Sequence, residues 1–191
     1  MLSLLKSTVL NDCHLITFSM GSYLAMKSII DTTNGVKSLV IISSDLSALS
    51  EDEIQTRKSI LQWLDSNQYT GMSRRRADKF VSHHNEDYQN VLDTLLLMDR
   101  ELGEDVLKMQ LNETTERRSL IGHLSEIDIP VLIVAGKEDK FIDIDALSIL
   151  IHQTEHCQIS LIDNCIHMVP LEKPKELAAL INKFYKDNRF V

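Results

Sequence analysis

The chain is poor in positive charge, in cysteine and in long apolar runs, and each shortage excludes a class of function. Its 191 residues carry 20 Lys and Arg against 28 Asp and Glu, which gives a net charge of −8. Binding to nucleic acid needs a surplus of Lys and Arg to neutralise phosphates, so we expect no nucleic-acid partner. We interpret the one basic run, 74–76, as a solvated helix end.

The three cysteines, Cys13, Cys157 and Cys165, include no C-x-x-C pair. This pattern predicts neither a disulfide framework nor a zinc site, and it is typical of a reducing, cytoplasmic setting. The N-terminal residues lack a basic leader with a long apolar stretch, and no apolar run is long enough to cross a bilayer. We therefore expect a cytoplasmic protein with no membrane partner.

Buried-strand patterns alternate with helical patterns along the chain, which predicts an α/β fold with a parallel sheet. The strand patterns cover residues 14–18, 36–43, 127–136 and 158–162. The nearly continuous apolar run at 36–43 is typical of a strand that is buried on both faces. Helices are expected at 1–10, 20–30, 144–152 and 173–188.

Residues 45–126 have a different texture, because charged and apolar residues interleave at helical spacing and β-branched runs disappear. We interpret this segment as a helical cap or lid between two parts of one α/β core, 1–44 and 127–191. Its helices are expected at 51–64, 74–83, 87–102 and 104–111. Five of its large side chains either line a pocket or simply pack: Trp63, Tyr69, Met72, Tyr88 and Met98.

Residues 14–26 combine a short apolar strand, a serine and a helix that begins at once. Gly21 stands two residues after Ser19, where we expect strand and helix to pass too closely for a larger side chain. Thr17, two residues before the serine, meets that demand only in part. Ser19 is either a nucleophile at a strained turn or a helix N-cap that accepts a backbone N–H.

Two further polar residues follow later strands, Asp139 after the third and His167 after the fourth. Because the carboxyl ends of parallel strands meet at one rim, Ser19, Asp139 and His167 can lie together. A histidine that a carboxylate orients can take the proton of a serine hydroxyl and return it near neutral pH. Three other residues are alternative acids: Glu138, Asp143 and Asp145.

Several segments resemble the α/β-hydrolase superfamily, and together they cover the chain from end to end. Segment 17–21 resembles its nucleophile elbow. Segment 129–139, with Gly136 three residues before the acid, resembles its acid strand and loop, and segment 164–174 resembles its histidine loop. Segment 98–129 resembles the end of the lid in hydrolases like enol-lactonases and short-chain carboxylesterases.

The resemblance implies a serine hydrolase that cleaves a carboxylic ester or lactone through an acyl-enzyme. Ser19 would be the nucleophile, His167 the base and Asp139 the orienting acid, and the backbone N–H of Met20 would bind the oxyanion. No cofactor and no metal are implied, and the partner is a small-molecule substrate. The lid, residues 45–126, would select the substrate, and its modest aromatic content favours a small or medium acyl group. The rival interpretation is a hydrolase-like binding or assembly module that keeps these residues without strong catalysis.

The resemblance also implies a missing part, because the superfamily carries strands before the elbow strand. A loop after one of them supplies a second oxyanion donor, and nothing before Ser19 fits that role. We therefore expect an N-terminally truncated fold and a weak catalyst. Its edge strand 14–18 would pair with a second copy or with a separate N-terminal piece. A fragment of a longer hydrolase is the alternative.

Overall fold

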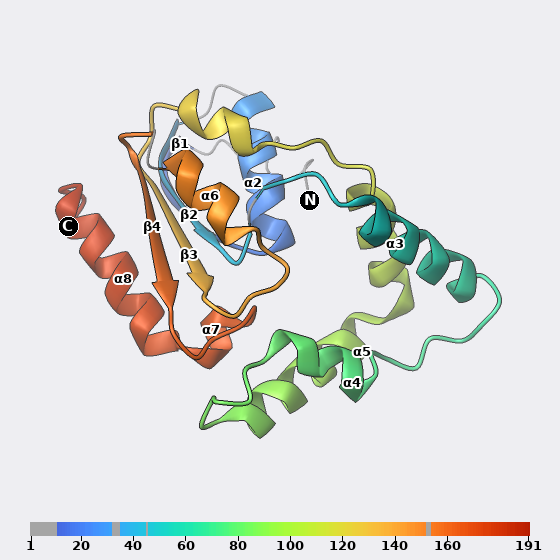
Figure 1. The fold of residues 1–191 in the computed structure, drawn as a ribbon. Helices are drawn as coiled ribbons and strands as arrows, with labels where there is room; N and C mark the ends of the chain where they lie inside the picture. Colours follow the sequence, from blue (N-terminus) through green and yellow to red (C-terminus); the bar gives the residue numbers. More distant parts are fainter. Residues whose placement is uncertain (1–10, 32–34, 45, 152–153) are drawn as a thin grey trace.

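The computed structural model describes residues 11–31, 35–44, 46–151 and 154–191 (Figure 1). Its sheet has four parallel strands in the order β1-β2-β3-β4. The strands are β1 (Asn11–Phe18), β2 (Gly35–Ile42), β3 (Val131–Gly136) and β4 (Cys157–Ile162). In register, Leu15 pairs with Leu39, Leu39 with Val131 and Val131 with Cys157. The predicted α/β fold with a parallel sheet is confirmed.

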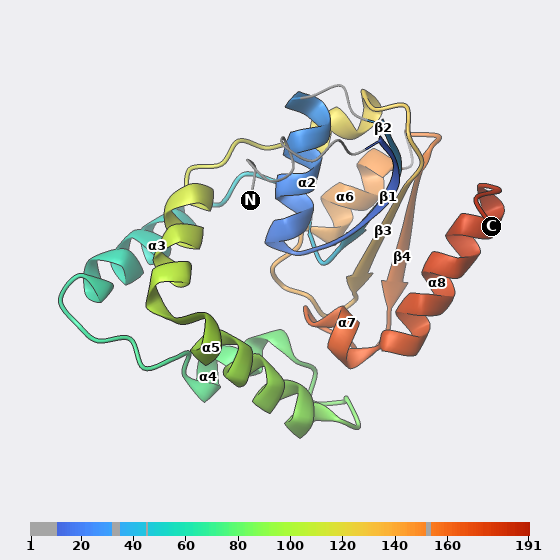
Figure 2. The ribbon, with the colours of Figure 1, turned by 180° about the vertical axis from the view of Figure 1, so that it is seen from behind.

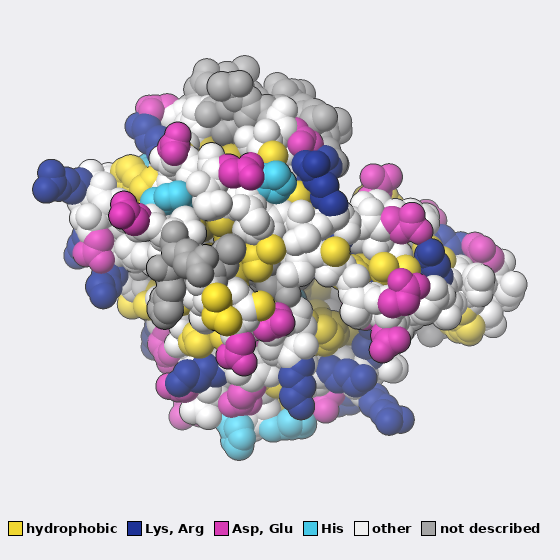
Figure 3. All heavy atoms as spheres, turned by 45° about the horizontal axis from the view of Figure 1, so that its top comes forward, with side chains coloured by type: hydrophobic (Ala, Val, Ile, Leu, Met, Phe, Trp, Pro, Cys, Tyr) yellow, Lys and Arg dark blue, Asp and Glu magenta, His cyan; other side chains and the backbone are white. Residues whose placement is uncertain are grey.

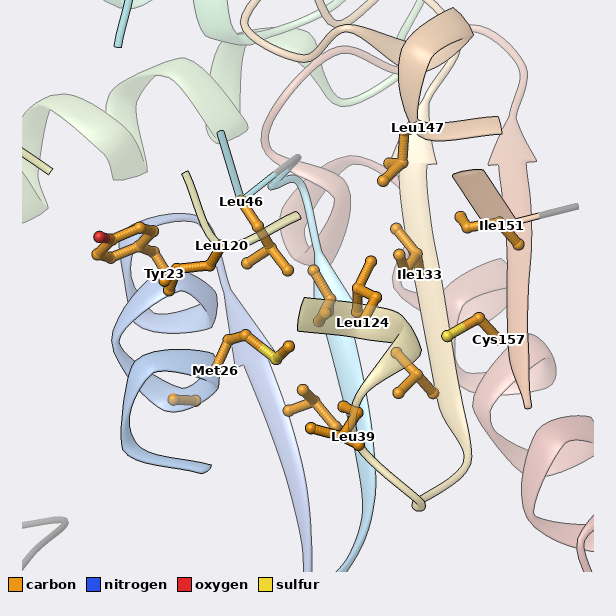
Figure 4. Packing of buried hydrophobic residues seen from close by; sticks show 14 of the residues in the cluster. Tyr23, Met26, Leu39, Leu46, Leu120, Leu124, Ile133, Leu147, Ile151 and Cys157 are labelled. Atoms are coloured by element: carbon orange, nitrogen blue, oxygen red, sulfur yellow. The ribbon is translucent and has the colours of Figure 1, made fainter. Parts of the chain in front are cut away.

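Helices cover both faces of this sheet (Figures 1 and 2). Helices α2 (Met20–Asp31) and α6 (Ile144–Ile151) lie on one face, and α8 (Pro174–Asp187) lies on the other. Successive residues of β2 point to opposite faces, so Leu39 packs with the α2 side and Val40 with the α8 side. Figure 4 shows the α2 side, where Leu39 and Ile133 of the strands lie among side chains from the covering helices.

The two central strands are more deeply buried than β1. Every residue of β3 is buried, and β2 is buried from Ser38 to Ile42, as its apolar run predicts. Strand β1 stands at one end of the strand order, and Ile16 in it is 55% exposed. Within the described residues, β1 has a strand neighbour on one side only.

Between β2 and β3 the chain forms helices that extend away from the sheet (Figure 1). They are α3 (Glu51–Leu64), α4 (Arg74–Ala77), the 3₁₀ turn η1 (Asp78–Phe80) and α5 (Tyr88–Thr114). We call residues 51–114 the helical insertion. A second 3₁₀ turn, η2 (Ile121–Ser125), returns to the sheet, where Leu124 packs in the α2-side core.

One helix prediction needs correction, and three others agree with the structure. The helix predicted at 74–83 ends at Phe80, because Val81 has an extended backbone (φ −127°, ψ 132°). The break predicted between the helices at 87–102 and 104–111 is confirmed, because the backbone of α5 leaves the helical conformation at Gly103 (φ 73°, ψ −175°), and the second part continues to Thr114. The last predicted helix, 173–188, is confirmed as α8, and a short helix that the sequence did not predict, α7 (Val169–Glu172), precedes it. The helix predicted at 1–10 lies outside the described residues.

Charged side chains of both signs are spread over the face that Figure 3 shows. In the view of Figure 3, Lys and Arg side chains lie at several separate places, with Asp and Glu side chains near them. Within the part of the chain that the structure describes, no helix has the length and apolar character needed to span a bilayer.

Candidate active site

Ser19 lies at a strained turn between β1 and α2. Its φ of 49° falls in the left-handed region that residues other than glycine rarely adopt. The turn is fixed by backbone hydrogen bonds, since Ser19 N donates to Ile42 O (2.7 Å) and Ser22 N donates to Ser19 O (2.9 Å). The side chain of Ser19 is thereby presented at the rim where the parallel strands end.

One steric expectation about this turn is wrong. A Cβ built at Gly21 has no other atom within 4 Å, so close passage of strand and helix does not require glycine there. Thr17 stands two residues before Ser19, and its hydroxyl donates to Val40 O (2.7 Å) on the neighbouring strand β2. The residue two before the serine therefore adds a hydrogen bond between β1 and β2.

The three residues singled out by the sequence lie together in a hydrogen-bonded chain. Ser19 Oγ lies 2.9 Å from His167 Nε2, and His167 Nδ1 lies 2.8 Å from Asp139 Oδ2. Asp139 and His167 are only 3% and 8% exposed. When Nδ1 carries the proton that Asp139 accepts, Nε2 has a lone pair for the serine proton.

Of the four candidate acids, Asp139 is the one that reaches the histidine. Its second oxygen, Oδ1, accepts the backbone N–H of Phe141 (2.9 Å), which fixes the carboxylate. Glu138 instead accepts the hydroxyl of Ser82 (3.3 Å). Asp143 accepts the N–H of Ala146 at the start of α6 (3.0 Å), and Asp145 is exposed within α6.

Gly136 allows the loop that carries His167 to cross the end of β3. We call residues 163–168 the histidine loop. A Cβ at position 136 would clash with the carbonyl oxygens of Ile166 and Cys165, so no larger residue fits. The N–H of Lys137 donates to Ile162 O (2.9 Å), and that of Glu138 donates to Cys165 O (3.2 Å). The segment that leads from β3 to Asp139 is thus joined by backbone hydrogen bonds to the end of β4 and to the histidine loop.

Three aromatic rings surround the imidazole of His167. Their centroids lie 5.5 Å (Phe18), 5.5 Å (Phe80) and 5.4 Å (Phe141) from its own. Phe80 and Phe141 are stacked on each other at 4.6 Å. The rings shield the imidazole from water, and a drier site strengthens its hydrogen bonds. The sequence did not reveal this shell, although Phe18 and Phe141 each stand within two residues of a predicted site residue.

Met20 is the first residue of α2, directly after Ser19. The first N–H groups of a helix have no partner within the helix and lie at its positive end. The N–H of Met20 is therefore available, beside the serine hydroxyl, for a developing negative charge.

A groove of about 570 Å³ lies between α3, α5 and the segment that connects α3 to α4. Trp63, Tyr69 and Met72 line it, which is one of the two alternatives that the sequence left open for them, together with Leu107 and Arg76. The hydroxyl of Tyr69 donates to Asp99 (2.6 Å). Burial and, to a smaller extent, this hydrogen bond raise the pKa of Tyr69.

The two other large side chains singled out by the sequence do not line this groove. Tyr88 stacks on His83 and donates to Asp78. Met98 is exposed on α5.

No metal site is evident in the described ranges, where His, Cys, Asp and Glu form no group of three or more that could hold an ion. The expectation of a reaction without a cofactor stays a prediction.

A parallel sheet with a serine at a strained strand-to-helix turn, and with acid and histidine loops at the same rim, defines the α/β-hydrolase superfamily. The family model of the serine aminopeptidases, S33, matches residues 5–174, and the chain belongs to this family.

The chain is also similar to a sequence relative and, in its fold, to solved structures. Over 78 residues the chain is 32% identical to monoacylglycerol lipase ABHD6 of Homo sapiens, a match that covers 41% of this chain and 23% of that protein. A thermophilic esterase from Thermogutta terrifontis superposes with a TM-score of 0.78 at 17% identity, over 91% of this chain and 64% of the esterase.

A putative non-heme bromoperoxidase, BpoC, from Mycobacterium tuberculosis gives a TM-score of 0.75 at 15% identity, over 97% of this chain and 70% of that chain. At these identities the two structures show the fold alone. The chain spans only part of the length of the proteins that it matches.

Proposed function

We propose that this chain is a serine hydrolase that cleaves a carboxylic ester or lactone through an acyl-enzyme on Ser19. The observation that carries the proposal is the continuous chain from Ser19 Oγ to His167 Nε2 (2.9 Å) and from His167 Nδ1 to Asp139 (2.8 Å). A serine hydroxyl is a weak nucleophile until a base takes its proton, and this geometry supplies the base.

In the first half-reaction, Ser19 Oγ attacks the carbonyl carbon of the ester while His167 Nε2 takes its proton. Asp139 stabilises the imidazolium, and the N–H of Met20 stabilises the oxyanion. When the tetrahedral intermediate collapses, the bond to the alcohol oxygen breaks, and His167 returns the proton to that oxygen. The acyl group remains on Ser19.

In the second half-reaction, His167 takes a proton from water, and the resulting hydroxide attacks the acyl carbon. The bond to Ser19 Oγ then breaks, Ser19 regains its proton from His167, and the carboxylic acid leaves. We assign selection of the substrate to the lid, residues 45–126. Its groove exposes more apolar than polar surface, and the relative of Homo sapiens is named monoacylglycerol lipase, so an ester with an aliphatic acyl group is the favoured substrate.

Hydrolysis of p-nitrophenyl acetate and p-nitrophenyl butyrate tests the proposal. The Ser19→Ala variant is expected to lose at least about 1000-fold in kcat/KM, because the nucleophile is removed. Ser22→Ala is the matched control, since the buried hydroxyl of Ser22 has no hydrogen-bond partner among the described residues. Equal slow rates in the wild type and in Ser19→Ala would instead support the non-catalytic binding or assembly module.

A pairing partner at strand β1 belongs to the same proposal. Beyond β1 the described residues supply no further strand, and the exposed Ile16 lies there. Unpaired strand edges associate readily, with a second copy or with a separate N-terminal piece. Light scattering at micromolar concentration is expected to give a mass above that of one chain, and a monodisperse monomer would contradict self-association.

A further inference from the structure

Glu172 is a buried carboxylate next to the proposed site but outside the Ser19–His167–Asp139 chain. It is the last residue of α7 and is only 6% exposed. Its oxygens accept two backbone N–H groups, Oε2 from Ser82 (2.6 Å) and Oε1 from Ile166 (3.1 Å). The thiol of Cys165 lies 3.6 Å from Oε1. Burial raises the pKa of the Glu172 carboxyl, whereas both N–H groups favour its ionised form.

The two N–H donors belong to different parts of the molecule. Ser82 lies in the helical insertion, and Ile166 lies in the histidine loop directly before His167. One buried side chain therefore joins the two segments. The amide of Asn85 strengthens the contact, since its Nδ2 donates to the carbonyl oxygen of Glu172 (2.8 Å).

The backbone around His167 depends on the same stretch of the insertion. The carbonyl oxygen of Phe80 accepts the N–H of His167 (3.1 Å) and also that of Met168 (3.2 Å). On the other side, the hydroxyl of Ser43 donates to the carbonyl oxygen of His167 (2.7 Å). The N–H of His167 is thus held by the insertion and its C=O by the residue that follows β2.

We propose that Glu172 is a positioning residue that clamps residues 80–85 of the insertion onto the histidine loop and so sets the distance from His167 Nε2 to Ser19 Oγ. Without this acceptor, the N–H groups of Ser82 and Ile166 are left buried and unpaired, and the segments separate to reach water. It follows that residues 80–85 are a fixed support, and that substrate reaches Ser19 without displacing them. The inference rests on the proposed function for its kinetic readout only.

The Glu172→Gln variant tests the clamp, because its amide turns an N–H donor toward one of the two donating backbone groups. Glu176→Gln is the matched control, since it removes the same charge from an exposed residue of the next helix. The first readout needs no substrate: the downfield proton resonance of the His167–Asp139 hydrogen bond, assigned by its loss in Asp139→Asn. We expect it to shift or broaden in Glu172→Gln and to stay unchanged in Glu176→Gln.

The second readout is the rate at which a fluorophosphonate modifies Ser19. We expect a fall of about 10- to 100-fold in Glu172→Gln, because a base displaced by about 1 Å loses that much efficiency. If Glu172→Gln does not fold, the same two readouts are measured on the Asn85→Asp variant. That variant keeps the oxygen that accepts Asp87 N but replaces the Nδ2 donor to Glu172, and we expect smaller changes in the same direction.

An unchanged resonance together with an unchanged modification rate in a folded Glu172→Gln variant would overturn the proposal. So would the absence of the downfield resonance from the folded wild type. If the wild type is not modified by the fluorophosphonate but its resonance responds to Glu172→Gln, the proposed function fails while the positioning role stands.

Discussion

The sheet and the helical insertion bury their residues very differently. All six residues of β3 are buried, whereas the 27-residue helix α5 buries only Val91, Leu92, Leu111 and Thr114. The sheet is covered on both faces, so its strands have little freedom to shift. The residues of the proposed site follow the ends of these strands. Their positions are therefore held by a packed core, which the insertion lacks along most of α5.

Near the site, Val81 and Leu92 of the insertion pack in one apolar cluster with Met168 of the histidine loop. Phe80, Ser82 and Asn85 touch the histidine loop or Glu172 by hydrogen bonds. Elsewhere the insertion exposes large apolar side chains, among them Trp63, Leu97, Leu102 and Met109. We infer that the sheet gives the site its geometry and that the insertion supports the histidine loop from one side.

The largest difference is expected from a matched pair of leucine truncations. Leu132 in β3 is 2% exposed, and Leu102 in α5 is 53% exposed. Leu132→Ala should lower the free energy of unfolding by about 2–5 kcal/mol, because it leaves a cavity in a packed core. Leu102→Ala should change it by no more than about 0.5 kcal/mol. Urea unfolding measures both, and similar losses would refute the contrast between the regions.

Gly136→Ala should cost about 3 kcal/mol of stability, because the new Cβ collides with backbone oxygens that cannot move aside separately. The histidine loop must shift as a whole, so fluorophosphonate modification of Ser19 should slow as well. Gly122→Ala is the control, since a Cβ there has no other atom within 4 Å. A Gly136→Ala variant with wild-type stability and modification rate would show that the histidine loop does not need this close approach.

Gly103→Ala affects the insertion by a different mechanism. A Cβ has free space there, but φ 73° with ψ −175° is accessible essentially to glycine alone. We expect a loss of about 1–2 kcal/mol from backbone strain, or a straighter α5, with little change in the modification rate of Ser19. Calorimetry and the fluorophosphonate assay test this together. A loss of modification as large as that of Gly136→Ala would mean that the kink positions the site.

Removing one helix cap should have the smallest effect. The Ser50 hydroxyl accepts the N–H of Glu53 at the start of α3 (3.2 Å). Ser50→Ala should therefore cost about 1 kcal/mol. In Ser59→Ala, which removes a hydroxyl bonded to Gln55 O within the same helix, a change below about 0.5 kcal/mol is expected. Thermal unfolding compares the two, and equal effects would argue against the cap.

The parts of the fold that follow local rules were predictable from the sequence. Apolar runs placed the four strands, and the chain order of Ser19, Asp139 and His167 after strand ends indicated that they could meet. The helix at 51–64 was predicted with the bounds that the structure gives, because Ser50 and the acidic first turn mark its start.

The remaining features depend on contacts between distant segments. Glu172 and Ser82 are 90 residues apart, and no periodicity relates them. Gly136 was noted by its spacing from the acid, but its steric reason is the passage of the histidine loop. The break in α5, in contrast, was predicted at Gly103 itself, since the helices expected at 87–102 and 104–111 end and begin on either side of it.

The measurement that tests the central claim most directly is the intact mass after incubation with a fluorophosphonate. The wild type, Ser19→Ala and His167→Ala would be compared, with Ser22→Ala as the control. We predict one adduct on the wild type and on Ser22→Ala, and none on Ser19→Ala or His167→Ala, because modification needs both the nucleophile and its base. No adduct on the folded wild type, or an adduct that persists in Ser19→Ala, would contradict the claim that His167 activates Ser19.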